Sequence, residues 1–450
     1  MKKIKLDNTD ESLYYDKLDC GLEIYMVPNN NINKFYLTLN TKFGSINTKF
    51  KYDNKEYDMP KGIAHYLEHL SFNMEDESAF DYYGKIGSSI NAFTTYDLTS
   101  YNVMSNNRFK ENLEYLLEYV YTPYFTKELF QSEKGVIEEE VKMYKDDPGM
   151  TIVNGTLKNV FVNDERKYLV GGTVKDVKSI KLEDVITCYN AYYNPKNMFL
   201  VITGNFNPNE ALAIVSEKMK ILNINNNFNV KDIYPKEPEK VYKNEETIKM
   251  NIDKPKISIG IKIPKRNFKS LKLEEYLLKI YLNSILDVNF GSTSLLLEEL
   301  QKGNIADDLD FSIIESNDYF IILFIGSTFY PEYFKDRIID KFNSLEVSSD
   351  DLQRIIKVNI SNYTLLFDSA VAVNNYIIDE VMDSGKVNSD FVNIIRSLDI
   401  DTCNKILNKL KSYDYAICKL MPNDKWWIAN IMFAFLIYIC YNIDIFKGKN

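Results

Sequence analysis

Cysteine is scarce in this chain, with only five among its 450 residues. The five are odd in number and widely scattered, and none has the close spacing of a thiolate metal site. They are Cys20, Cys188, Cys403, Cys418 and Cys440. This pattern excludes a disulfide framework and favours a reducing compartment. We therefore expect the body of the protein in the cytoplasm.

The chain also lacks an excess of basic residues. It has 54 Lys and Arg against 64 Asp and Glu, which gives a formal net charge of −10. Nucleic-acid binding needs clustered cations that neutralise phosphates, and the sequence has no such cluster. The composition therefore argues against a nucleic-acid partner.

No apolar run follows the basic first residues, so the sequence does not predict a secretory signal peptide. One uncharged stretch, residues 426–443, is about as long as the minimum for spanning a bilayer. Trp426 and Trp427 begin it, as aromatic residues do at membrane interfaces, whereas Asn430 and Asn442 are costly in lipid. Two hypotheses stay open: a membrane anchor, or a helix packed on the body or on a partner.

What is present is enough hydrophobic sequence, 45% of residues, for a large core and more plausibly for two domains of about 200 residues each. An Asn- and Pro-rich stretch interrupts the periodic segments and gives the best internal boundary. We expect domains at 1–222 and 241–425, joined by a linker at 223–240, with the apolar tail at 426–450.

The two halves begin alike. In the first, strand-like runs at 21–28 and 34–45 flank a turn-forming asparagine cluster and predict a hairpin; the second opens with a similar run at 256–264. Each half continues with helical stretches and further strands, as at 271–286 and 350–382 in the second. This pattern predicts an α+β fold built from two similar domains.

A helix is expected around residues 59–72, with Asp58 as its N-cap and Pro60 in its first turn. His65 and His69 are four residues apart, so both imidazoles project from one face and can grip a single ion. Glu68 shares this face, where it is suited to accept a proton from the attacking water.

Chance could also place two histidines four apart on an amphipathic helix. The composition argues against chance, because the chain has only two histidines and both lie in this motif. We therefore interpret His65, Glu68 and His69 as the core of a zinc site.

A His pair needs a further protein ligand, and residues 132–148 form a strongly helical stretch with four glutamates. Such a run is most often a solvated acidic face. Apolar side chains mark its expected buried side: Val136, Ile137, Val141 and Tyr144. Glu140 lies among them and is the predicted third ligand, with Glu133 two turns earlier as a supporting carboxylate of the catalytic set. Glu138 and Glu139 are expected to point more toward solvent.

These motifs resemble the pitrilysin/insulinase family of metallopeptidases, which includes the mitochondrial processing peptidase, and in particular its half-size bacterial members. The HxxEH motif with a later glutamate, and another glutamate seven residues before it, matches residue by residue. The resemblance implies two similar domains, each a mostly antiparallel β-sheet packed against helices, with one Zn²⁺ per chain. The second domain is expected to have no metal site.

The same resemblance extends to the segment SSINAFTTYDLTSY, which is similar to the family's substrate-pairing edge strand. It assigns substrate binding to Asn91, Ala92, Phe93 and Thr94, since an exposed strand edge can recognise a peptide backbone. Taken alone, these residues would be an ordinary hairpin strand. The implied activity is hydrolysis of short or unfolded peptides by a metallopeptidase.

One departure concerns the second half, where family members usually have an Arg and a Tyr near the substrate. Here Glu299 and Ala306 stand at those places. The resemblance therefore implies a partner, a second half-size homologue that forms a homo- or heterodimer. Two other functions stay open: a non-catalytic peptide-binding subunit of a two-chain processing peptidase, and a zinc hydrolase that acts on other substrates.

Overall fold

The computed structural model describes residues 1–224 and 227–423. The apolar tail at 426–443 lies outside these residues. Within them, no helix combines the length and apolar character needed to cross a bilayer.

The first half contains a seven-stranded sheet in the order β1-β2-β3-β9-β4-β8-β7. Its strands are β1 Lys2–Lys5, β2 Ser12–Lys17, β3 Glu23–Pro28, β4 Phe35–Thr41, β7 Ser89–Thr94, β8 Thr99–Ser105 and β9 Met198–Gly204. The pairing of β3 with β9 is parallel and the other pairings are antiparallel. The hairpin expected from the runs 21–28 and 34–45 is wrong, because β9 lies between β3 and β4 and pairs with both. A small second sheet pairs β5 Lys49–Tyr52 with β6 Lys55–Asp58 and with β10 Lys231–Asp232, which lies in the interval 223–240.

The second half contains a five-stranded sheet in the order β11-β15-β12-β14-β13. Its strands are β11 Glu245–Met250, β12 Lys256–Pro264, β13 Asp310–Glu315, β14 Tyr319–Ser327 and β15 Asp414–Pro422. This order repeats β3-β9-β4-β8-β7 strand for strand, and β11 with β15 is again the parallel pair. The predicted α+β fold of two similar, mostly antiparallel halves is confirmed.

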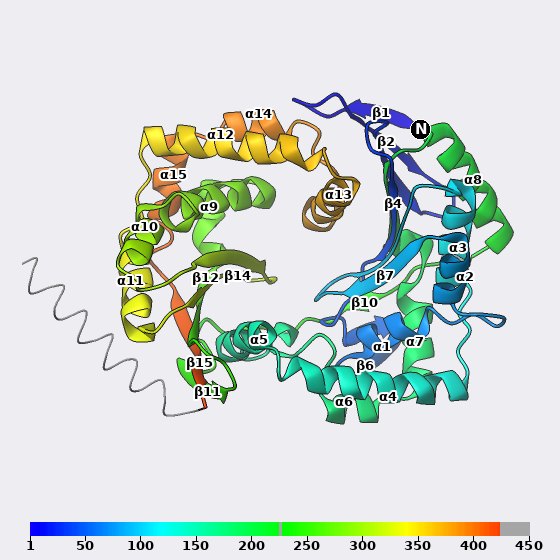
Figure 1. Cartoon of the computed structure of the whole chain (residues 1–450), viewed down its shortest axis with the longest axis horizontal. Coiled ribbons are helices and arrows are strands. Elements are labelled where there is room, and N and C mark those ends of the chain that lie inside the picture. The colour runs from blue at the N-terminus through cyan, green and yellow to red at the C-terminus, as the bar shows by residue number, and fades with distance from the viewer. Residues whose placement is uncertain (225–226, 424–450) are drawn as a thin grey trace, which may run out of the picture.

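Helices cover the sheets, as Figure 1 shows. Those of the first half are α1 Ile63–Leu70, α2 Ala79–Ile86, α3 Phe109–Tyr121, α4 Lys127–Tyr144, α5 Pro148–Val160, α6 Val174–Ser179, α7 Leu182–Tyr192 and α8 Pro208–Leu222. Those of the second are α9 Glu275–Phe290, α10 Leu295–Lys302, α11 Pro331–Asn343, α12 Ser349–Leu366, α13 Ala370–Ser384, α14 Phe391–Arg396 and α15 Ile400–Leu407. Short 3₁₀ helices occur at Glu165–Lys167, Pro195–Asn197 and Lys265–Leu271. The expected helical stretch at 350–382 is thus two helices, α12 and α13.

Two helices are exchanged between the halves. Helix α5 of the first half packs on β12 and β15 of the second sheet, whereas α13 of the second half packs on β4 and β9 of the first (Figure 1). Gly260 of β12 lets α5 approach closely, because a Cβ there would lie 2.6 Å from Val160 and 3.0 Å from Thr156. Each sheet is therefore covered in part by the other half of the chain.

Each exchanged helix presents a buried asparagine to the foreign sheet. On α13, the Asn374 amide donates to the Val201 carbonyl at 3.3 Å and accepts from Thr38 Oγ1 at 2.8 Å. On α5, the Asn159 amide donates to the Ile417 carbonyl at 3.0 Å. Separating the halves would leave these groups without partners, which is costly for buried polar atoms.

A buried ion pair joins the two halves below α5. Lys262 Nζ of β12 lies 2.6 Å from Glu237 Oε1, and the two side chains are 0% and 4% exposed. The Glu237 carboxylate also accepts the backbone N–H groups of residues 162, 163 and 164, which follow α5. Burial opposes ionisation of Glu237, but Lys262 and these N–H groups outweigh it and hold its pKa below the ordinary value.

Because the folded-state pKa of Glu237 is lowered, its ionised form stabilises the fold above the unfolded pKa, and this contribution is lost as the pH falls through the folded value. We expect Glu237→Gln to lower the free energy of unfolding by about 3 kcal/mol at pH 7, since Lys262 would stay buried without a counter-charge. Urea titrations of both proteins measure this difference, which should shrink below about pH 4.

Glu239→Gln is the matched control, because Glu239 pairs with Arg266 where both side chains are more than half exposed. It should cost less than about 1 kcal/mol. Equal effects of the two substitutions would contradict the role given to Glu237.

Candidate active site

Helix α1 begins at Ile63, after Gly62 in a left-handed conformation with φ of 82°. The expected cap is wrong: Asp58 ends strand β6, where it pairs with Lys49, and Pro60 lies before the helix. The β5–β6 hairpin holds Asp58 too early in the chain to reach the free N–H groups of the first turn.

Gly62 fixes where α1 starts. A Cβ at this position would lie 2.3 Å from the carbonyl oxygen of Gly171, and Gly172, also at positive φ, lies against the carbonyl of Lys61. The chain after the first 3₁₀ helix therefore touches the start of α1 backbone to backbone. This contact positions the imidazole of His65, which lies within a turn of it.

Three of the predicted residues converge on one point. The ligand atoms of His65, His69 and Glu140 all lie within 4.8 Å of one another. Nε2 of His65 is 3.6 Å from Glu140 Oε1, and Nε2 of His69 is 3.2 Å from Glu140 Oε2. The two imidazoles hold the pKa of the Glu140 carboxyl well below its ordinary range.

Two further side chains hold these residues in place. Glu133 Oε2 lies 3.4 Å from His69 Nδ1, the nitrogen that faces away from Glu140. Burial lowers the pKa of His69, but the Glu133 and Glu140 carboxylates outweigh it and raise this pKa to about 9. The Tyr144 hydroxyl donates to Glu140 Oε1. This last role was not predicted from the sequence, although Tyr144 is four residues after Glu140 on the same helix face.

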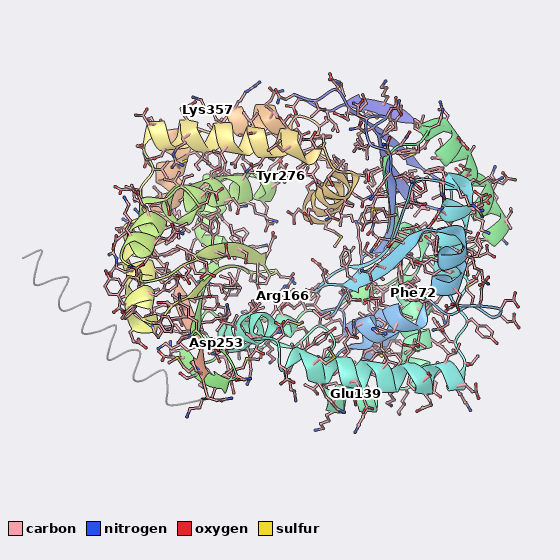
Figure 2. All side chains as sticks on the ribbon, viewed as in Figure 1. Phe72, Glu139, Arg166, Asp253, Tyr276 and Lys357 are labelled. Atoms are coloured by element: carbon pink, nitrogen blue, oxygen red, sulfur yellow. The ribbon has the colours of Figure 1, made fainter. Side chains whose placement is uncertain are left out.

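The consecutive acids of α4 differ as helical geometry requires. Glu138 pairs with Lys178 of α6 at 3.6 Å, and Glu139 is 71% exposed. Figure 2 shows Glu139 on the side of α4 away from α1. Val136 was expected on the buried side but is 54% exposed. The buried apolar stripe of α4 is therefore narrower than predicted and is formed by Phe130, Ile137 and Val141.

Glu68 lies beside His65, His69 and Glu140 and is 6% exposed. Burial raises the pKa of its carboxyl. Its Oε2 accepts a hydrogen bond of 2.5 Å from the Thr94 hydroxyl of β7, so the strand predicted to bind substrate also fixes this carboxylate. No spacing in the sequence signals this contact, because it joins residues on a helix and a distant strand.

Within residues 1–224 and 227–423, strand β7 is an edge of the first sheet and pairs only with β8. Asn91 and Phe93 are exposed, while Ala92 and Thr94 are half-buried on the other face. Among the described residues, the outer edge of β7 therefore has backbone N–H and C=O groups without a strand partner beside Glu68. The side chain of Phe93 is 38% exposed.

The donor set fits Zn²⁺. Two imidazoles and one carboxylate are common ligands of catalytic zinc and leave a fourth position open. Ligands about 2.0–2.1 Å from a tetrahedral centre lie roughly 3.3 Å apart, which is close to the two nitrogen–oxygen separations given above. Among the residues 1–224 and 227–423, no other group of three such side chains brings its ligand atoms this close.

Comparison with known proteins places the chain in a family. Residues 46–168 match the profile described as Insulinase (Peptidase family M16), and residues 179–355 match the one described as Peptidase M16 inactive domain. This chain belongs to the M16 family of peptidases, as a half-size member.

The individual relatives agree. The chain is 30% identical over 433 residues to the "Uncharacterized zinc protease YmfH" of Bacillus subtilis, an alignment that covers 94% of this chain and 99% of YmfH. It is 24% identical to the "Putative zinc protease AlbF" of the same species over 47% of this chain and 50% of AlbF.

Solved structures share the fold. A putative M16-like peptidase from Alicyclobacillus acidocaldarius superposes with a TM-score of 0.84 at 21% identity, over 92% of this chain and 99% of that one. The first half of the periplasmic protease PqqL from Escherichia coli gives 0.69 at 15% identity, over 95% of both chains. In the whole of PqqL the match covers 49% of that chain.

The second half places Glu299 away from this site. Glu299 lies on α10. Arg337 of α11 donates two hydrogen bonds to its carboxylate, from Nε to Oε1 at 2.9 Å and from Nη2 to Oε2 at 2.6 Å. Ala306 is buried, 1% exposed. Figure 1 shows α10 on the opposite side of the molecule from α1 and α4. The charge of Glu299 is therefore balanced within its own half.

The geometry predicts which of the three consecutive acids matters for metal. Glu140→Gln should lose most of the bound zinc, because a neutral amide replaces the carboxylate that faces both imidazoles. Glu138→Gln and Glu139→Gln are the matched controls and should keep zinc at the level of the unmodified chain. Elemental analysis of the folded, dialysed proteins measures this, and equal zinc in all three variants would refute the assignment.

Proposed function

We propose that this chain is a zinc endopeptidase that hydrolyses short or unfolded peptides, with His65, His69 and Glu140 as metal ligands. The convergence of these three side chains beside the buried carboxylate of Glu68 carries the proposal. Zinc, when bound, polarises the scissile carbonyl and makes water more acidic. The names of the relatives, zinc proteases, support the same activity.

Glu68 is the proposed general base. Its carboxylate accepts the proton of the attacking water and passes it to the leaving amine nitrogen. Burial favours this role, since it brings the pKa of Glu68 up toward the working pH. Thr94 donates a hydrogen bond to one carboxylate oxygen, Oε2, and the other oxygen is the proposed proton acceptor.

The edge of β7 is the proposed binding place of the peptide backbone. An extended segment can add to it as a further strand, and the exposed ring of Phe93 offers contact to a substrate side chain. A folded protein keeps its backbone groups paired and cannot add in this way. This is why the proposal is restricted to short or unfolded peptides.

We expect Glu68→Gln to keep zinc and to lower turnover of an unstructured peptide by about 10²–10⁴-fold, because the water loses its proton acceptor. Zinc content and the rate of peptide cleavage are measured on the same folded sample. Glu56→Gln, which alters an exposed carboxylate of β6, serves as control and should leave both unchanged. If the chain is instead a non-catalytic subunit, the unmodified protein will show no cleavage that a chelator abolishes.

A second half-size homologue is the proposed partner. Glu299 and Ala306 stand where the family resemblance places an Arg and a Tyr near substrate, and α10, which carries Glu299, lies on the opposite side of the molecule from α1 in Figure 1. A partner that supplies these groups from its own second half would stabilise the negative charge of the tetrahedral intermediate.

The purified chain alone should therefore bind zinc and cleave an unstructured peptide slowly. Addition of a half-size homologue should raise kcat/KM by about hundredfold, the typical contribution of one such donor. Titration of the homologue against a fixed amount of this chain measures the gain. Full activity of a monodisperse monomer, unchanged by any homologue, is the contrary result.

A further inference from the structure

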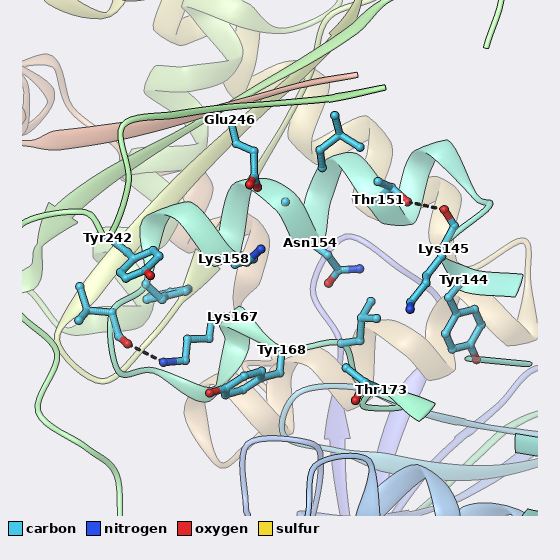
Figure 3. Close-up of a pocket in the computed structure, with 15 residues that line it drawn as sticks. Tyr144, Lys145, Thr151, Asn154, Lys158, Lys167, Tyr168, Thr173, Tyr242 and Glu246 are labelled. Carbon is cyan, nitrogen blue, oxygen red and sulfur yellow. Dashed lines mark hydrogen bonds between the residues drawn. The ribbon is translucent and has the colours of Figure 1, made fainter. Parts of the chain in front are cut away.

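A cavity of about 690 Å³ lies along α5, between the first half and strand β11. Figure 3 shows it bounded by α5 on one side and by Tyr168 and Thr173 on the other, with Tyr144 and Tyr242 at its ends. Its size is that of a pocket for a small molecule or for the end of a peptide. None of the residues described above as metal ligands lines it.

The lining of this cavity is positively charged, whereas the protein as a whole is negatively charged. Lys145, Lys158 and Lys167 line it, whereas the formal net charge of the chain is −10. The one acidic residue in the lining, Glu246, is paired with Lys243 at 3.2 Å. A negatively charged ligand group is therefore favoured here.

Two of the three lysines are free to bind such a group. Lys167 Nζ donates to the Val162 carbonyl at 2.6 Å. Lys145 and Lys158 form no ion pair with any part of the chain that the structure describes. Figure 3 shows them on either side of Asn154, so a ligand that lies along α5 can meet an ammonium group from each side.

The remaining walls are largely apolar. Phe161, Leu169 and Ile248 line the cavity together with the rings of Tyr168 and Tyr242. A hydrated inorganic anion would leave the apolar walls in contact with water. A ligand with an apolar body and one anionic group would bury these walls and place its charge beside the lysines.

The cavity adjoins the metal site through one residue. Tyr144 lines it and donates its hydroxyl to the carboxylate of Glu140. A Cβ built on Gly171, which lies between the lining residues Leu169 and Thr173 in the chain, would lie 3.3 Å from the Tyr144 ring and 3.4 Å from His65 Nδ1. A ligand in the cavity is therefore separated from the ligands of the metal by little more than a tyrosine ring.

We propose that this cavity binds the carboxyl-terminal end of a peptide, with its free carboxylate between Lys145 and Lys158 and its last apolar side chain against Phe161 and Ile248. The inference rests on the proposed peptidase function for the identity of the ligand. The carboxylate is held beyond Tyr144, so the site favours substrates in which the internal bond that is cut lies near the carboxyl-terminal end.

The test measures binding to the full chain with Glu68→Gln, which keeps the peptide intact. Three fluorescent peptides of one unstructured sequence are compared: one ending in a free carboxylate after leucine, its carboxamide, and a carboxamide with aspartate in place of the last leucine. The free acid should bind about tenfold more tightly than the carboxamide, as expected for a charge-assisted hydrogen bond. Recovery of tight binding by the aspartate peptide would show that any terminal carboxylate suffices and would overturn the assignment to the main-chain carboxyl group.

Lys145→Met with Lys158→Met, in the same background, should abolish the preference for the free acid and leave the affinity for the carboxamide within about twofold. Methionine keeps most of the apolar length of lysine, so the fold is not at risk from a cavity. Lys142→Met is the matched control, because Lys142 lies on α4 in an exposed pair with Glu139 and should leave the preference intact. Equal affinities for acid and carboxamide, or a preference that survives in the double variant, would overturn the proposal.

The same double substitution in the unmodified enzyme should raise KM for the free acid about tenfold with little change in kcat, since a bound carboxylate contributes to ground-state and transition-state binding alike. Failure of the peptidase proposal has a different outcome: no peptide is cleaved by any variant, while the binding comparison still decides the cavity.

Discussion

The exchange of α5 and α13 between the two sheets is the constraint on which the rest of the structure depends. Each helix buries an asparagine against backbone and hydroxyl groups of the foreign sheet, so the halves cannot part without leaving buried polar groups unsatisfied. Helix α5 begins at Pro148, only four residues after Tyr144. The helix that presents Glu140 is therefore anchored at its end to the second sheet, and the position of Glu140 depends on both halves of the chain.

The candidate site joins elements that are far apart in sequence. Helix α1 presents His65, Glu68 and His69, α4 presents Glu133 and Glu140, and β7 fixes Glu68 through Thr94. The two helices meet at Gly171, because the absence of a side chain there lets the backbone lie against both Tyr144 and His65. Glu68 is thus held by the same strand that is proposed to receive the peptide. A substrate that adds to this strand would reach the base without any large movement of either group.

Much of this site could be predicted from the sequence because its signals are local. Helical spacing is enough to put His65 beside His69 and to separate Glu140 from Glu139. The role of Thr94 was not predictable, since a contact between a helix and a distant strand leaves no periodic trace. The predictions that Asp58 caps α1 and that Val136 is buried were wrong for another reason. Periodicity indicates which face of a helix is buried, but it gives neither the residue at which the helix begins nor the width of the buried stripe. The exchange of α5 and α13 could not be predicted either, because the sequence of an amphipathic helix does not indicate which sheet it packs against.

The identical strand order of the two halves and their exchanged helices have a consequence for the origin of the chain. Two separate copies of one ancestral half that traded this helix would form a domain-swapped dimer with the same arrangement. Joining them through one backbone turns association into an intramolecular event, with an effective concentration set by the connecting segment. One copy could then lose its metal ligands while still completing the other, because its sheet and its exchanged helix remained indispensable to the shared fold.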